Sequence, residues 1–372
     1  TIQYQINSTS GTWTTIANGG TISGRSHGDT VYARLTDGSN TGNYASVSIK
    51  DTIAPTVSIS TSNLTYNSVK LKVTASDAQS GLATSGTYKY YLGSTLKSTS
   101  TTNSYTFTGL TANTKYTLKV VVTDKAGKTT EKSTTVTTAS VAASTILKEG
   151  NYVNYVDKNG TTRKCVVLYG PENANYSTYG IQIITMDTVE DIEIGNGTGS
   201  TSSTIADLYT ARTAYNGVIS MLNTRAEAYL NTTYASKARS VGSKPDNPSY
   251  DRADTYNRDD SWFSLYYDMF KDTDRNYVTD YNQLNALSIT NIGKGYWLAS
   301  REAMDDYSNS NFDVRTISSS GSLLSRDIAN ISIIGPHSYC YTNGLRPVFT
   351  LNTNLKVTGG SGTSSSPYTL GT

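Results

Sequence analysis

Residues that alternate between apolar and polar recur along the first 139 positions of the chain. Apolar and polar residues alternate along residues 30–35 and 44–50, which is typical of a strand with one buried face. The same pattern predicts further strands at residues 56–60, 68–76, 87–92, 104–108, 115–124 and 132–137. Turn sequences such as Asp37-Gly38 and Asp124-Lys125-Ala126-Gly127 separate them. This part of the chain is therefore expected to form antiparallel sheets.

A different period appears after a Ser/Ala/Thr linker at residues 140–147. Three strands are expected at 151–156, 162–169 and 179–186, and then apolar residues recur at helical spacing. They are Leu208, Ala211, Tyr215, Val218, Ile219, Leu222, Ala226, Tyr229 and Leu230. The spacing predicts a long helix over about 204–231, capped by Ser203 or Thr204, with its apolar stripe against a core. A shorter helix is expected at 261–270 and a short turn at 281–287.

The stretch from Gly295 to Phe349 has two apolar ends and a polar middle. Residues 296–298, Tyr-Trp-Leu, are bulky enough to anchor a buried strand. Residues 345–349 form a second apolar run, in which Pro347 fits an edge, a bulge or the start of a strand. The span between them is rich in Asp, Asn, Ser and Tyr. We expect this span to form a long polar display surface held by two rigid ends.

These motifs resemble a known family. The WLASR segment at 297–301, a strand at 312–315 and the GLRPVF segment at 344–349 are similar to bacterial C-type-lectin-like domains. Such domains lie at the C-terminal ends of exported surface and pilus-associated proteins. The resemblance covers about 145–372 and implies a compact α+β fold whose loop-rich face binds a ligand. In some relatives retroelements diversify this region.

Resemblances also organise the first part of the chain. Residues 53–139 resemble an immunoglobulin or fibronectin type III-like sandwich, in which Tyr116 would tie a loop to a strand. Residues 1–52 resemble part of a bacterial immunoglobulin-like module. The predicted fold class is thus multi-domain: β-sandwich immunoglobulin-like modules at 1–52 and 53–139, followed by an α+β C-type-lectin-like domain at 145–372.

Composition narrows the class of protein. The net charge of +2 gives no electrostatic argument for nucleic acid, and no apolar run is long enough to insert into a membrane. Charged residues make up only 16%, and 29 tyrosines stand against 5 phenylalanines, which suits an exported β-rich protein at the cell surface. No signal peptide is recognisable, so we expect a fragment of a longer exported protein. Cys165 and Cys340 are expected either to form a disulfide or to stay as two buried thiols.

The candidate ligand-binding residues come from the polar span, because tyrosine and asparagine combine stiff contact area with adaptable hydrogen bonds. They are Asp305, Asp306, Tyr307, Asn309, Asn311, Asp327, Asn330, Tyr339, Tyr341 and Asn343. The competing interpretation is an ordinary solvated loop.

A calcium loop is the one cofactor site that the sequence leaves open. The residues Asp272, Asp274, Asn276 and Asp280 place oxygen ligands at positions 1, 3, 5 and 9 of such a loop. Position 6 is Tyr277 where glycine is needed, and position 12 is Gln283 in place of a bidentate glutamate. The Glu-Pro-Asn and Gln-Pro-Asp motifs of calcium-dependent sugar-binding lectins are missing from the sequence, so the class of ligand stays open.

The sequence therefore predicts a surface adhesin or ligand-binding protein that recognises a host or bacterial surface protein or a glycan. One alternative is a structural subunit at the tip of a pilus or phage fibre. The other is a glycosidase using Asp305 or Asp306. No complete catalytic constellation is found, so an enzyme is not expected.

Overall fold

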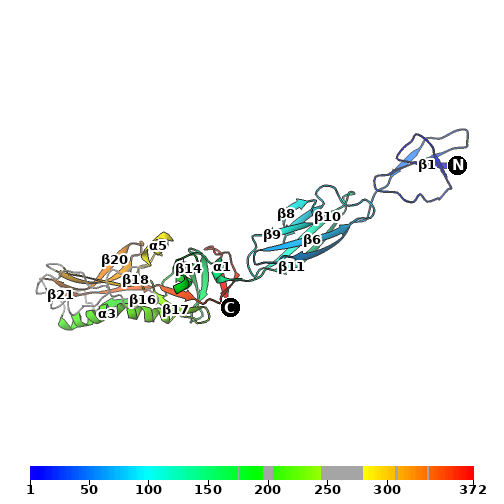
Figure 1. Ribbon diagram of the computed structural model, residues 1–372. Helices are drawn as coiled ribbons and strands as arrows, with labels where there is room; N and C mark the ends of the chain where they lie inside the picture. The colour runs from blue at the N-terminus through cyan, green and yellow to red at the C-terminus, as the bar shows by residue number, and fades with distance from the viewer. Residues whose placement is uncertain (175, 196–203, 244–279, 306–308, 333–334) are drawn as a thin grey trace. The chain divides into compact units, whose positions relative to one another are not determined.

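The protein is a multi-domain chain built mainly of β-strands (Figure 1). A computed structural model describes residues 1–174, 176–195, 204–243, 280–305, 309–332 and 335–372. Contacts along the chain divide it into two units, Thr1–Ala139 and Ser140–Thr372. The boundary lies just before residues 140–147, which the composition predicts as a linker. That prediction is wrong, because Val141–Ala142 form a strand and Ala143–Ile146 a short helix of the second unit.

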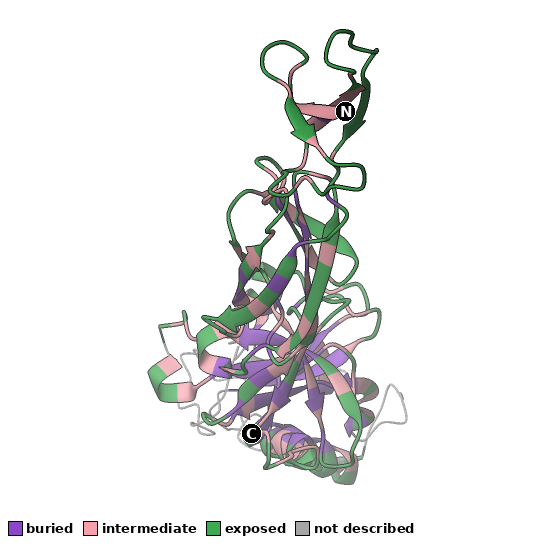
Figure 2. Cartoon of the chain, turned by 90° about the vertical axis from the view of Figure 1, so that its right-hand side faces the viewer, coloured by how far each residue is buried: buried purple, intermediate pink, exposed green. Residues whose placement is uncertain are grey.

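The first unit begins with a small four-stranded sheet. Its order is β2-β1-β3-β4, formed by Thr14–Ile16, Ile2–Ile6, Thr30–Leu35 and Ala45–Ser48. Among residues 1–50, all of which the structure describes, Val31 is the one buried apolar side chain. Figure 2 accordingly shows these strands mostly as intermediate or exposed. This sheet has almost no core of its own.

The rest of the first unit is two sheets that share one core. One sheet has the order β5-β6-β9, formed by Thr56–Ser62, Ser68–Ser76 and Ser104–Thr108. The other has the order β11-β10-β7-β8, formed by Thr129–Thr137, Lys115–Thr123, Tyr88–Leu92 and Thr95–Ser100. Alternate residues of β6 and β10, such as Leu71 and Val120, are fully buried in the shared core. The predicted strands are confirmed, and β8 is a strand that the pattern missed.

Two predicted local features of this unit are confirmed. The backbone N–H of Thr111 donates to the Tyr116 hydroxyl at 2.9 Å, so this side chain does tie the loop after β9 to β10. The hairpin between β10 and β11 turns at Gly127, whose φ of 82° is a conformation that glycine adopts without a Cβ clash.

The second unit is framed by an eight-stranded sheet. Its order is β12-β24-β25-β13-β14-β15-β23-β17. The strands are β12 (Val141–Ala142), β13 (Tyr152–Val156), β14 (Thr162–Tyr169), β15 (Gln182–Thr185), β17 (Ala235–Ser240), β23 (Pro347–Leu351), β24 (Lys356–Gly359) and β25 (Tyr368–Gly371). The short helices α1 (Ala143–Ile146) and α2 (Tyr176–Tyr179) join them. Pro347 begins β23, one of the positions that its missing N–H allows.

A six-stranded sheet is inserted between the strands of this frame. Its order is β16-β22-β18-β19-β20-β21. The strands are β16 (Glu190–Gly195), β18 (Tyr296–Asp305), β19 (Asn309–Ile317), β20 (Leu323–Ser332), β21 (Gly335–Ser338) and β22 (Cys340–Leu345). Strands thus occupy most of the polar span, in which the sequence predicts a strand only at 312–315. Hydrogen bonds between neighbouring strands form this sheet in a region where the sequence shows no regular alternation of apolar and polar residues.

Helix α3 (Ile205–Glu227) covers one face of the six-stranded sheet. It begins with a capping box, in which Thr204 and Asp207 satisfy each other's backbone N–H groups. Its buried side chains, among them Leu208 and Tyr215, form one cluster with Trp297 and Phe312 of the sheet. The predicted core role of the helix is confirmed.

The predicted short turn at 281–287 is the short helix α5 (Tyr281–Ala286). The predicted short helix at 261–270 lies outside the described residues. Within the described ranges, no helix combines the length and apolarity that crossing a membrane requires.

No disulfide joins Cys165 and Cys340, and both stay as thiols. Cys165 lies on β14 in the eight-stranded sheet and is fully buried, whereas Cys340 on β22 is partly exposed. The structure therefore favours the thiol alternative, although only one of the two side chains is buried.

This difference predicts unequal thiol reactivity. Burial raises the pKa of Cys165, so neither the thiolate nor a path for a reagent is available in the folded chain. We expect a colourless disulfide reagent such as DTNB to modify Cys340 first, and Cys165 only after denaturation. A Cys340→Ser variant isolates the slow site, and rapid native labelling of that variant would contradict the prediction.

Candidate functional site

The six-stranded sheet presents two chemically different faces. On β19, Phe312 and Val314 belong to the cluster under α3. Because successive strand residues point to opposite faces, Asn311, Asp313 and Arg315 lie on the face away from that helix. Cross-strand pairing then fixes which residues of β20 lie beside them.

We call this second face the polar strand face. Asp313 is paired with Asp327, and Arg315 with Ser325, across β19 and β20. The residues of this face are Asn311, Asp313, Arg315, Ser325 and Asp327. A bulge at Ile328 restores the register, so that these polar residues stay on one face along both strands.

The polar strand face carries both charged groups and hydrogen-bonding groups. The Arg315 guanidinium donates to the Ser325 hydroxyl at 2.9 Å, which holds the long side chain along the strand pair. Asp313 and Asp327 face each other across the strands, an arrangement of like charges that costs stability in a sheet. Asp313 is 5% exposed, and the other four are partly exposed. The face therefore offers fixed acceptors and one arginine, and it lacks the apolar surface of a core.

An aromatic row lies along β21 and β22. His337, Tyr339 and Tyr341 occupy alternate positions, and successive ring centroids are 6.5 Å apart. The Arg326 guanidinium lies over the Tyr341 ring, 5.3 Å from its centroid. Burial, and then the charge of Asp327, raise the pKa of Tyr341, so its hydroxyl stays protonated at neutral pH.

The tyrosine at 341 faces the helix side of the sheet. Tyr341 pairs with Ile194 across β16 and β22, and Asn343 pairs with Ile192. Both isoleucines belong to the core under α3, and Tyr341 packs against that core. These two candidate residues are therefore on the face opposite the polar strand face.

The candidate ligand-binding residues are thus divided. Asn311 and Asp327 lie on the polar strand face, Tyr341 and Asn343 lie on the helix side, and Tyr339 connects β21 to β22. Asp305, Asn309 and Asn330 fall on β18, β19 and β20, and their side chains are outside the description. Asp306 and Tyr307 lie outside the described residues. The described members do not share one loop surface, because strands send alternate side chains to opposite faces.

Of the four residues of the predicted calcium loop, the structure describes Asp280. Asp280 is buried, and its carboxylate accepts from Arg239 Nη1 at 2.6 Å, from the N–H of Gly242 at 2.7 Å and from the Tyr169 hydroxyl at 3.0 Å. Its described contacts are therefore to protein donors. Asp272, Asp274 and Asn276 lie outside the described residues, so the loop stays a prediction.

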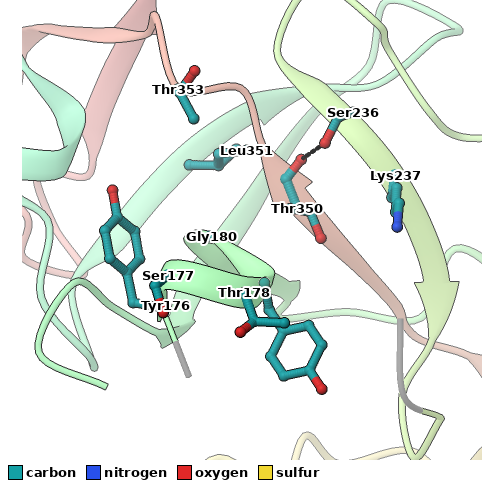
Figure 3. A pocket seen from close by; sticks show the side chains of 10 residues that line it. Tyr176, Ser177, Thr178, Gly180, Ser236, Lys237, Thr350, Leu351 and Thr353 are labelled. Atoms are coloured by element: carbon teal, nitrogen blue, oxygen red, sulfur yellow. Dashed lines mark hydrogen bonds between the residues drawn. The ribbon is translucent and has the colours of Figure 1, made fainter. Parts of the chain in front are cut away.

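A pocket of about 350 Å³ lies beside α2, between β17 and the end of β23 (Figure 3). Its lining is Tyr176, Ser177, Thr178, Tyr179, Gly180, Ser236, Lys237, Thr350, Leu351 and Thr353. Tyr176 comes from the α2 side and Lys237 from β17. Its hydroxyl-rich lining suits hydrogen bonding to a small polar ligand. The Tyr-Ser-Thr-Tyr run before Gly180 is the sequence signal for it. The predicted strand at 179–186 begins too early, because Tyr179 ends α2 and β15 begins at Gln182.

Comparisons with known proteins add little to this geometry. No protein-family model matches the chain, and no curated protein matches it. Among solved structures, chitinase ChiA74 from Bacillus thuringiensis is similar over 40% of this chain and 20% of its own, with 26% sequence identity and a TM-score of 0.22. The chain thus spans about a fifth of that protein, and a TM-score this low supports no inference about fold or activity.

Proposed function

We propose that the chain is an extracellular ligand-binding protein or adhesin of a bacterial surface. In this proposal immunoglobulin-like and fibronectin type III-like modules precede a C-type-lectin-like domain, which recognises a surface protein or a glycan without covalent chemistry. The observation that supports it best is the polar strand face, because five polar side chains lie on one face of two paired strands.

Strands suit recognition for a physical reason. A binding group held by sheet hydrogen bonds loses little conformational freedom when a ligand arrives, so less of the interaction energy is offset by ordering. Asn311 and Asp327 can accept hydrogen bonds, and Arg315 can donate them. A glycan hydroxyl or a polar protein loop has the complementary groups.

The test is a binding screen of the full chain against a glycan array and a panel of host and bacterial surface proteins. For any ligand found, we expect Asn311→Ala combined with Asp327→Asn to weaken binding by about tenfold or more. A hydrogen bond to the charged Asp327 contributes about 1.5–3 kcal/mol, and one to the neutral Asn311 about 0.5–1.5 kcal/mol. Surface plasmon resonance measures the change.

The matched control lies on the other face. Tyr341→Phe removes one hydroxyl while keeping the ring against the core, and it should leave affinity within about twofold. Loss of binding in the control but not in the double variant would reject the polar strand face as the site.

The alternatives give different outcomes. A structural tip subunit would show no ligand in the screen and would self-associate in sedimentation experiments. A glycosidase would release sugar from a polysaccharide, and Asp305→Asn or Asp306→Asn would abolish the turnover. The pocket beside α2 is a second candidate ligand site, and Lys237→Gln tests it against the same ligands.

A further inference from the structure

Three aspartates from distant parts of the first unit meet at one end of its two-sheet sandwich. Asp51 lies in the connection between β4 and β5, Asp77 follows β6, and Asp124 follows β10. One carboxylate oxygen of each lies within 4.8 Å of the others. We call these three residues the acidic cluster.

The topology explains why they converge. The start of β5 pairs with the end of β6, which brings the segment before β5 close to the loop that contains Asp77. That loop is attached to the end of β10, where Lys125 N–H donates to the Gly81 carbonyl and Leu82 bridges Asp124. The three carboxylates are therefore positioned by the sheets and not by one local turn.

Two of these carboxylates are buried and incompletely satisfied. Asp51 is 4% exposed and Asp124 is 2% exposed. Each uses Oδ1 to accept from a backbone N–H, that of Ile53 or of Lys128, at 2.9 and 2.8 Å. The second oxygen, Oδ2, has no hydrogen-bond partner in either residue. A buried carboxylate oxygen without a partner costs free energy, which indicates that a further group belongs there.

No cationic side chain of the described residues supplies that group. Among the described residues, none of the three aspartates forms an ion pair with lysine or arginine. The Lys125 ammonium lies near Gly81, but it does not reach the carboxylates within ion-pair distance. Ser80 lies close enough to lower the pKa of Asp51, yet its hydroxyl hydrogen bond goes to Asp77. Within the part of the chain that the structure describes, three carboxylates therefore meet without a balancing lysine or arginine.

We infer that the acidic cluster is a calcium site. Calcium binds carboxylate oxygens at about 2.3–2.6 Å, so two ligands on opposite sides of the ion are about 4.6–5.2 Å apart. Oxygens that lie within 4.8 Å of one another can contact such an ion with little movement. Magnesium demands a near-ideal octahedron and usually keeps several waters, whereas calcium accepts irregular sets of carboxylate oxygens such as these three from separate segments. The site is separate from the predicted loop at residues 272–280 and independent of the proposed function.

Binding there would tie two parts of the first unit together. Asp51 belongs to the segment that leads from the four-stranded sheet into the sandwich, and its N–H donates to His27 Nδ1 at 3.1 Å. Asp77 and Asp124 belong to the sandwich itself. A bound ion therefore fixes this connecting segment to the end of the sandwich.

The test is calcium titration of the full chain by isothermal calorimetry after treatment with EDTA. We expect Asp51→Asn and Asp124→Asn each to abolish one binding equivalent, or to weaken it by at least about tenfold. Either asparagine keeps the Oδ1 acceptor for its backbone N–H, so the local hydrogen bond survives. The matched control is Glu131→Gln, which removes one exposed carboxylate from the same sandwich. Unchanged stoichiometry and affinity in both cluster variants would overturn the inference.

Thermal unfolding gives a second readout that separates metal binding from a purely structural role. Calcium should raise the melting temperature of the first unit in the unmodified chain and in Glu131→Gln, but not in Asp124→Asn. In EDTA, Asp124→Asn should be at least as stable as the unmodified chain, because it removes charge repulsion between carboxylates. A calcium-independent loss of stability in both Asp51→Asn and Asp124→Asn would contradict the proposed site.

Discussion

Replacing Asp280 by asparagine is expected to lower the free energy of unfolding of the second unit by about 3–5 kcal/mol. The Asp280 carboxylate is 1% exposed and the Arg239 side chain 7% exposed. Arg239 donates to both carboxylate oxygens, at 2.6 and 3.1 Å, and Gln182 accepts from the same guanidinium. Asparagine would remove the Asp280 charge from its contact with the buried guanidinium, which is more costly than losing an exposed pair. Urea denaturation followed by circular dichroism measures the change.

An exposed ion pair of the same unit provides the control. Asp191 pairs with Lys294 at 2.6 Å, and both side chains are 50% exposed. Asp191→Asn should therefore cost less than about 1 kcal/mol. Equal losses in the two variants would show that the buried pair has no special role.

The same variant distinguishes two interpretations of Asp280. A residue that only holds Arg239, Gly242 and Tyr169 in place should destabilise the chain equally in calcium and in EDTA. A calcium ligand would show its loss mainly in calcium. We expect equal losses, because its described hydrogen bonds already employ both carboxylate oxygens.

The second large effect is expected at Arg346. Its side chain is completely buried, and it donates to the carbonyls of Thr185 at 2.6 Å and Ile289 at 2.8 Å and to the Tyr296 hydroxyl at 3.1 Å. Burial lowers the pKa of Arg346, and contacts with Tyr296 offset part of that effect. Arg346→Ala should lower the free energy of unfolding by about 3–5 kcal/mol, because it opens a cavity and strips buried acceptors of their donor.

The matched control is Arg225→Ala. Arg225 is ion-paired with Glu190 but 54% exposed, so its loss should cost less than about 1 kcal/mol. Chemical denaturation of the two variants side by side checks the difference. If Arg346→Ala were as stable as Arg225→Ala, the three hydrogen bonds would contribute nothing net to the fold.

Local features of the fold could be predicted wherever periodicity and turn chemistry agreed. The helix at 205–227 has a regular apolar stripe and a capping threonine, and the strand at 296–298 has three bulky residues. The hairpin between β13 and β14 turns at Gly160, whose φ is 81°. In these segments, the pattern and the tertiary structure favour the same conformation.

The strands of the polar span could not be predicted in the same way. The apolar residues of 323–332 do not alternate regularly with polar ones, and residues 335–338 are Gly-Pro-His-Ser, so neither segment shows a clear strand period. Pairing with the neighbouring strands defines them instead. For the same reason, the sequence pattern suggested one display surface where the sheet has two faces. Contacts at long sequence separation, such as Arg239 with Asp280 or Asp51 with Asp124, leave no periodic signal. The first of these contacts neutralises a buried charge, and the second brings two buried carboxylates together.

The pairing of β13 with β25 has a mechanical consequence. These strands are parallel neighbours near the two ends of the second unit, with Val153 opposite Tyr368 and Asn154 opposite Thr369. Tension applied between Ser140 and Gly371 would pull them in opposite directions along their own axes. The hydrogen bonds between them would then be loaded together, in shear, and would not open one after another as in a peeled hairpin. Under force, the lifetime of the folded unit depends on its unfolding rate. In this geometry the hydrogen bonds between β13 and β25 must break together before the unit unfolds, which should slow unfolding.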